Sequence, residues 1–155
     1  MSELLHPLRI AIDGNEANTE NRVGSNVYAF EILKALEELT RKKRKGYDFT
    51  ILLSSTPIAD LPPARAGWNY EVIQPAKMWT QWAEPLYLSR HRHDYDVFYT
   101  PGHYAPRRCQ IPYVTSVMDL AFLKFPEQFR RKDLVQLTNW TNYSVKKAQK
   151  IVAIS

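Results

Sequence analysis

The first candidate for chemistry is a loop with the sequence Val23-Gly24-Ser25-Asn26, which opens a predicted helix. A glycine here lets backbone N–H groups approach a phosphate, and the N-terminus of a helix favours negative charge. The loop lacks the three glycines of a dinucleotide fingerprint and the lysine and serine of a P-loop. Two interpretations stay open. Either Gly24, Ser25 and Asn26 bind a phosphate, or Gly24 only turns the chain and Ser25 caps the helix.

Two further candidate segments follow predicted strands. In the first, Asp119 comes after Met118 and could accept hydrogen bonds from a sugar hydroxyl, although an aspartate there more often forms a turn. The second carries His103 and Tyr104. A histidine titrates in the range of a proton carrier, although a histidine in a surface loop is commoner. We expect no metal site at His91 and His93, which diverge on a helix and have no cysteine nearby.

These candidates depend on a regular alternation of strands and helices. Apolar runs predict strands, and apolar residues at helical spacing predict helices. Pro85 lies inside the second helix, where it requires a kink or a new start. The strands are expected at 9–13, 48–53, 70–73, 96–99, 113–117 and 151–154, and the helices at 25–41, 79–91 and 126–147. This alternation predicts an α/β fold, doubly wound and mostly parallel, with a Rossmann-like sheet and helices on both faces.

Ligands of such a sheet bind at the carboxyl ends of the strands. That rule selects the segments after Asp13, Tyr99 and Val117, and the position of Ser155. Ser155 would suit the N-cap of a following helix. We therefore expect residues 1–155 to be the N-terminal, acceptor-side domain of a larger two-domain protein whose C-terminal domain is absent.

Composition narrows the class of protein. The chain has 155 residues, of which 45% are hydrophobic and 24% charged, as in one globular domain. No apolar run approaches the roughly 20 residues of a membrane-spanning helix. We expect the first residues not to be a secretory signal, since they lack a basic start and a long apolar stretch, and the single cysteine, Cys109, cannot form an internal disulfide. A reducing, cytoplasmic location is the simplest interpretation.

The net charge of +5 is concentrated in the basic run at 41–45. Nucleic acid, an anionic membrane surface and a phosphorylated ligand are possible partners. Alternatively, the run is a solvated helix C-terminus. The aromatic residues do not interleave with it as a stacking platform would, so we expect no nucleic acid but a weak association with the inner face of an anionic membrane. These aromatics are Trp79, Trp82, Trp140 and Tyr143.

Five segments in order resemble the N-terminal domain of retaining glycosyltransferases of the GT-B architecture, glycosyltransferase family 4. They are RIAIDGNEA (9–17), NRVGSNVYAFEILKAL (21–36), DVFYTPGHYAP (96–106), IPYVTSVMDLAFLKFPEQF (111–129) and KKAQKIVAIS (146–155). Together they cover nearly the whole chain. The resemblance implies transfer of a hexose from a nucleotide-diphosphate sugar to a glycan or lipid-linked acceptor, as in cell-envelope glycan biosynthesis. It implies no metal and no cofactor besides the donor.

The resemblance also assigns roles to residues. Gly24, with Ser25 and Asn26, matches the loop that faces the donor diphosphate, and Asp119 matches the aspartate of a catalytic His-Asp pair. Met118 stands where the family has a histidine that contacts the donor sugar, and methionine cannot donate that hydrogen bond. Met118, His103 and Tyr104 are the expected substrate-binding residues.

The family's donor-binding cations and paired glutamates belong to its second domain. We therefore expect the isolated chain to be inactive without that domain or a partner chain. The alternative is a non-catalytic module that binds a nucleotide, a glycan or a protein, which Met118 favours slightly. Without a covering domain, we expect exposed apolar surface and self-association, with Phe122, Phe125, Tyr104 and Trp79 as the exposed residues.

Overall fold

The computed structural model describes residues 6–42, 46–102 and 104–154. Its strands are β1 (Leu8–Asp13), β2 (Tyr47–Leu53), β3 (Trp68–Val72), β4 (Val97–Thr100), β5 (Tyr113–Val117) and β6 (Lys150–Ala153). Its α-helices are α1 (Ser25–Lys42), α2 (Ala83–Arg90), α3 (Ala121–Lys124) and α4 (Arg131–Lys147). Short 3-10 helices cover Trp79–Gln81 and Pro126–Gln128.

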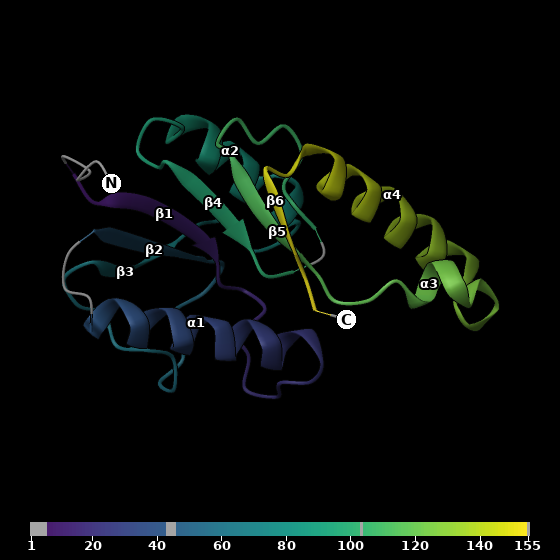
Figure 1. Ribbon diagram of the computed structural model, residues 1–155, viewed down its shortest axis with the longest axis horizontal. Coiled ribbons are helices and arrows are strands. Elements are labelled where there is room, and N and C mark those ends of the chain that lie inside the picture. The colour runs from purple at the N-terminus through teal and green to yellow at the C-terminus, as the bar shows by residue number, and fades with distance from the viewer. Residues whose placement is uncertain (1–5, 43–45, 103, 155) are drawn as a thin grey trace.

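The strands form one sheet in the order β3-β2-β1-β4-β5-β6, and all neighbouring pairs are parallel. Helix α1 covers one face of this sheet, while α2 and α4 cover the other (Figure 1). The predicted doubly wound, Rossmann-like α/β fold is confirmed. Strand order reverses between β1 and β4, and ligands of such folds bind outside the carboxyl ends of the strands at this point.

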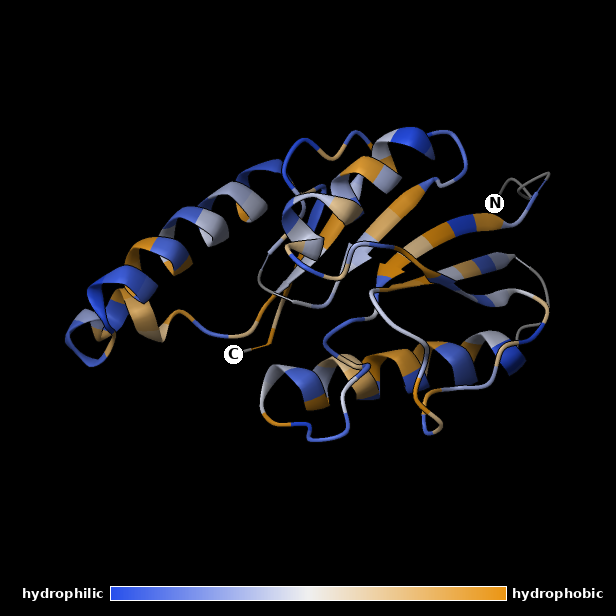
Figure 2. Cartoon of the chain, turned by 180° about the vertical axis from the view of Figure 1, so that it is seen from behind, coloured by the Kyte–Doolittle hydropathy of each residue, from blue (hydrophilic) through white to orange (hydrophobic). Residues whose placement is uncertain are grey.

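Two apolar clusters hold the layers together. Along β2, Ile51 and Leu53 face α1, while Leu52 between them faces the other side, as the two-residue period of a strand requires. Leu33 of α1 and Leu88 of α2 are fully buried in the two clusters. The strands are largely hydrophobic, and the helices also carry hydrophilic segments (Figure 2). Both faces of β1 and β2 are therefore buried towards their carboxyl ends, which explains the nearly continuous apolar sequences there.

The helix predicted at 79–91 is divided. A 3-10 helix (Trp79–Gln81) is followed by α2, and Pro85 lies in the first turn of α2. A proline there removes an N–H that has no partner within the helix, so the new start is the arrangement that the structure adopts.

The prediction of one helix over 126–147 is wrong at its start. Pro126 begins only a 3-10 helix, and the backbone of Phe129 and Arg130 is extended, with ψ angles of 144° and 140°. Helix α4 therefore starts at Arg131. The short helix α3, which precedes this break, was not predicted. A proline favours the start of a helical turn, but it does not determine how many turns follow.

The expected exposed aromatics are partly wrong. Phe122 and Trp79 are buried, Tyr104 is half-buried, and only Phe125, at 41% exposure, lies clearly at the surface. Trp79 packs into the cluster beneath α2 and donates its ring N–H to the carbonyl of Ile73 at 3.2 Å. Self-association stays a prediction.

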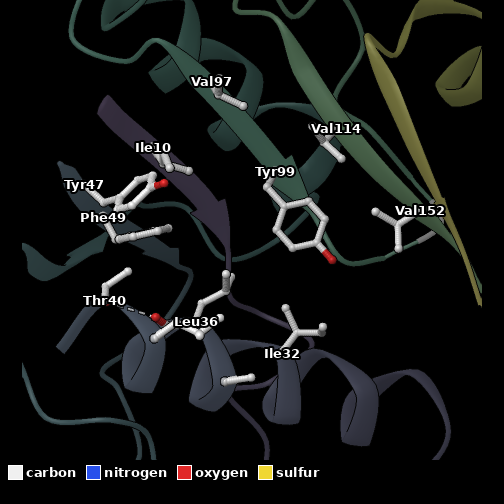
Figure 3. Close-up of a pocket in the computed structure, with 12 residues that line it drawn as sticks. Ile10, Ile32, Leu36, Thr40, Tyr47, Phe49, Val97, Tyr99, Val114 and Val152 are labelled. Atoms are coloured by element: carbon white, nitrogen blue, oxygen red, sulfur yellow. Dashed lines mark hydrogen bonds between the residues drawn. The ribbon is translucent and has the colours of Figure 1, made fainter. Parts of the chain in front are cut away.

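An apolar surface that was not predicted lies beside α1. A hollow of about 530 Å³ lies between α1 and the strands of the same face, with Ile32 and Leu36 on one wall and Val97, Tyr99 and Val114 on the other (Figure 3). The crossover helices α2 and α4 lie on the opposite face of the sheet, so they leave this part of the sheet open. No helix within the described ranges is both long and apolar enough to cross a membrane.

Candidate functional site

Asp13 lies at the carboxyl end of β1, at the point where strand order reverses. It is only 7% exposed, and its Oδ1 accepts a hydrogen bond from the backbone N–H of Asn15 at 3.0 Å. Burial raises the pKa of Asp13 to about 7; the Asn15 bond opposes this rise, and the charge of Glu16 adds to it. Asp13 is therefore a carboxyl group that can gain or lose a proton near neutral pH.

Glu16 joins the loop after β1 to the start of α1. Its carboxylate accepts hydrogen bonds from the hydroxyl of Ser25 at 2.7 Å and from the side-chain amide of Asn26 at 3.0 Å. A carboxylate is favoured here because the N-terminus of a helix carries partial positive charge. Glu16 also adjoins the segment after β4, since a Cβ atom at Gly102 would lie 3.7 Å from its Cγ. The loops after β1 and β4 thus meet at Glu16.

Gly24 precedes α1 and has the left-handed backbone that favours glycine, with a φ of +52°. A Cβ atom there would meet no atom within 4 Å. The glycine therefore serves the turn, and the space beside it is open. Ser25 is the first residue of α1, and its hydroxyl donates to Glu16. The structure places Ser25 and Asn26 around this carboxylate, and Gly24 directly precedes them in the chain.

Asp119 and Met118 follow β5. Asp119 is exposed, and its Oδ1 accepts the backbone N–H of Ala121 at 2.8 Å, which holds the start of α3. Met118 is half-buried. Among the hydrogen bonds of the described residues, none links Asp119 to Ser25 or Asn26. In this structure Asp119 has the role of a turn former.

Of the pair after β4, His103 lies outside the described residues. Tyr104 is half-buried, and its ring meets that of Trp140 edge-on, with the centroids 5.4 Å apart. Burial raises the pKa of Tyr104, and the charges of Glu16 and Asp133 add to the rise. The contact with Trp140 ties the segment after β4 to α4.

Three hydroxyl groups, from α1, β4 and β5, lie close together between the helix and the sheet. The hydroxyl oxygen of Tyr28 in α1 lies 3.2 Å from the hydroxyl oxygen of Tyr99 in β4 and 3.1 Å from that of Ser116 in β5. The hydroxyls of Tyr99 and Ser116 are 2.9 Å apart. This cluster ties α1 to the sheet. Nothing in the local sequence predicts this cluster, because a helical tyrosine and two strand residues converge only when the elements pack together.

Glu84 is the second residue of α2 and is fully buried. Neither of its carboxyl oxygens has a hydrogen-bond partner in the part of the chain that the structure describes. Burial raises its pKa well above the ordinary value, and the nearby charge of Asp13 adds to the rise. Burial therefore favours the neutral form of the Glu84 carboxyl group. The local sequence does not predict this burial either, since a glutamate in the first turn of a helix is usually solvated.

The arrangement suits polar, hydroxyl-bearing ligands. Asp13 and Glu16 supply acceptor oxygens, and the N-terminus of α1 supplies a region favourable to an anion. Across the ranges 6–42, 46–102 and 104–154, no group of three or more histidine, cysteine, aspartate or glutamate side chains could hold a metal ion. His91 instead contacts Asp94 through Nδ1 at 2.7 Å.

Fold and site together define a Rossmann-like α/β domain with a polar edge at the carboxyl ends of β1 and β4. Comparisons of the chain with family models, with curated proteins and with solved structures find no match.

Proposed function

We propose that this chain is the N-terminal, acceptor-side half of a sugar-nucleotide-dependent glycosyltransferase. The observation that supports it best is the meeting of two loops at Glu16. One loop carries Gly24, Ser25 and Asn26, and the other follows β4 and includes Gly102. These are the two segments that the resemblance assigns to the donor diphosphate and to the substrates, and they lie at the place where doubly wound sheets bind ligands.

The chemistry at this edge would be electrostatic. A diphosphate would lie beside Gly24, where the open space and the N-terminus of α1 favour an anion. The carboxylate of Glu16 competes for the same N-terminus, so donor binding would displace it from Ser25. Sugar hydroxyls would then donate to Glu16 and Asp13. In this proposal Asp119 takes the catalytic position near the transferred sugar, as its match to the family implies.

The second candidate function is a non-catalytic module that binds a nucleotide, a glycan or a protein. Two observations favour it: Met118 replaces the histidine of the family, and Glu16 already places negative charge at the start of α1. A module of this kind would bind its ligand at the same edge but would have no need of a second domain.

Binding and turnover separate the two functions. The isolated chain is titrated with UDP-, GDP- and dTDP-hexoses while amide chemical shifts are recorded, and hexose transfer to glycan and lipid-linked acceptors is assayed in parallel. The proposal expects shifts at Gly24, Ser25 and Asn26 with no turnover, and turnover once a donor-binding domain is supplied in trans. Shifts confined to other parts of the chain would contradict it. Binding that is unaffected by such a domain, again without turnover, would favour the module.

A further inference from the structure

A second concave surface lies on the other face of the sheet, between α2 and α4. Two hollows of about 590 and 580 Å³ adjoin there, because Arg108, Gln110 and Tyr143 line both. The first extends over α2 and the second towards the C-terminal end of α4. We call this surface the α2–α4 groove. It is separate from the strand-end site, since no residue that lines it belongs to the loop of Gly24 or to the segment 118–119.

The groove carries unpaired positive charge. Arg107, Arg108 and Lys147 line it, and no aspartate or glutamate lines either hollow. Among the described residues, no carboxylate forms an ion pair with any of these three cations. Three other arginines of the chain, Arg9, Arg22 and Arg65, each hold a carboxylate within 2.8 Å. The carboxylates of an acidic partner could therefore pair with these cations without displacing a carboxylate of the chain itself.

The two arginines are held in place by aromatic side chains. The guanidinium of Arg107 lies 5.2 Å from the ring centroid of Trp140 and 5.5 Å from that of Tyr143. The backbone N–H of Arg108 donates to the hydroxyl of Tyr143 at 2.7 Å. The ring contacts restrict the side chain of Arg107 before any partner arrives, which lowers the entropy that binding would cost, and the hydrogen bond fixes the backbone at Arg108.

Apolar side chains lie exposed beside these cations. Trp82 is 67% exposed and Leu86 is 52% exposed, and both line the first hollow. Large apolar side chains at this exposure, next to arginines, form the usual composition of a recognition surface. The amides of Gln81, Gln110 and Gln149 also line the groove, and each can donate to and accept from a peptide backbone.

We propose that the α2–α4 groove is a docking site for an acidic segment of another protein, with glutamates or aspartates on the arginines and a bulky apolar side chain against Trp82 and Leu86. The concave shape favours a peptide over a membrane, because a bilayer surface cannot fill a recess. The aromatic residues favour a peptide over nucleic acid. Single-stranded nucleic acid binds by stacking its bases on several exposed rings. Here Trp140 and Tyr143 already contact Arg107, which leaves Trp82 as the exposed ring for stacking.

The test uses the whole chain and a fluorescein-labelled synthetic peptide of glutamates and leucines around one tryptophan. Fluorescence anisotropy should show saturable binding, and a peptide with glutamine in place of every glutamate should bind roughly tenfold more weakly. The variant Arg107→Gln/Arg108→Gln should lose a similar factor. The matched control Arg131→Gln/Lys132→Gln removes the same charge from the start of α4 and should change affinity less than about twofold. Circular dichroism establishes that both variants fold.

Several results would overturn the proposal. They are the absence of saturable binding, equal binding of the glutamine peptide, and equal losses in the two double variants. Binding to phosphatidylserine vesicles and to a single-stranded oligonucleotide is measured in parallel, to test a membrane and a nucleic acid as alternative partners. If either binds more tightly than the acidic peptide and loses affinity only in Arg107→Gln/Arg108→Gln, the groove recognises that class of ligand and the peptide proposal is wrong.

Discussion

The hydroxyl of Ser25 donates a hydrogen bond to the carboxylate of Glu16 over 2.7 Å. The chain thereby places one of its own anions at the N-terminus of α1. This is the position where the resemblance to glycosyltransferases expects a diphosphate. Glu16 stabilises this loop and opposes an incoming anion, so substitution can separate its two effects.

Glu16→Gln should reduce stability and strengthen anion binding. The amide keeps one acceptor oxygen but loses the charge that favours the helix N-terminus, so we expect a loss of about 1 kcal/mol in urea denaturation. Calorimetry with UDP should show tighter binding, because repulsion from the diphosphate is removed. The pKa of Asp13, about 7 in the wild type, should fall, since the charge of Glu16 raises it. Carboxyl NMR measures that shift.

The matched control is Glu20→Gln, which removes the same charge from an exposed position in the same loop. It should leave stability within about 0.5 kcal/mol of the wild type. Weaker UDP binding in Glu16→Gln than in the control would mean that Glu16 itself contacts the ligand, and would contradict the competition described above.

Substitutions of Gly24 distinguish a turn from a phosphate site. Its φ of +52° disfavours most side chains, but no neighbouring atom would meet a Cβ. Asparagine tolerates this conformation, so Gly24→Asn should fold with a loss below about 1 kcal/mol, while Gly24→Val should lose roughly 1–2 kcal/mol. Thermal unfolding measures both. If the loop binds a diphosphate, both variants should also bind UDP more weakly, and unchanged affinity would leave Gly24 with the turn alone.

Glu84→Leu should stabilise the protein, and more so at high pH. The folded pKa of Glu84 is raised, so the folded state holds a proton that the unfolded chain releases above its ordinary pKa of 4.5. Wild-type stability should therefore fall as the pH rises from this value towards the folded pKa, by at most about 1.4 kcal/mol per pH unit for this group. In Glu84→Leu the free energy of unfolding should no longer fall with pH through this group. Urea denaturation at a series of pH values measures it.

Asp13 provides the control for that experiment. Its pKa rises from 3.8 to about 7 in the folded protein, so it causes a decline of the same sign that ends near pH 7. Asp13→Asn should remove the decline that ends near pH 7, and Glu84→Leu should remove the decline that continues up to the folded pKa of Glu84. A Glu84→Leu variant that is less stable than the wild type at pH 8 would show that the carboxyl group is required by the fold.

Ser144→Ala should destabilise the contact between α4 and the segment after β4. The hydroxyl of Ser144 accepts the buried N–H of Ala105 at 2.9 Å and donates to the carbonyl of Trp140 at 2.8 Å. Alanine would leave the N–H of Ala105 without its partner, which costs roughly 1–3 kcal/mol. Ser89→Ala, a serine on α2, is the control and should change stability by less than about 0.5 kcal/mol. Equal effects of the two changes in denaturation would contradict the role of Ser144.

The pattern of apolar residues was sufficient to predict the layers of this fold. Runs such as 9–13 and 48–53 are apolar on both sides, which a strand shows only when helices cover both faces of its sheet. The spacing at 25–41 predicted α1 almost to the residue, because its apolar stripe repeats with the period of a helix. The rule that ligands bind at strand ends then directed attention to the loop of Gly24 and to the segments after β4 and β5.

Tertiary structure decided the properties of individual side chains. The burial of Glu84, the meeting of Tyr28 with Tyr99 and Ser116, and the contact of Glu16 with Ser25 all depend on how separate elements pack. The break before α4 and the open groove around Arg107 have the same origin. A periodic pattern records which residues face a core, because burial is repeated along an element. It carries no record of which distant groups meet, because that is set by the packing of elements against one another.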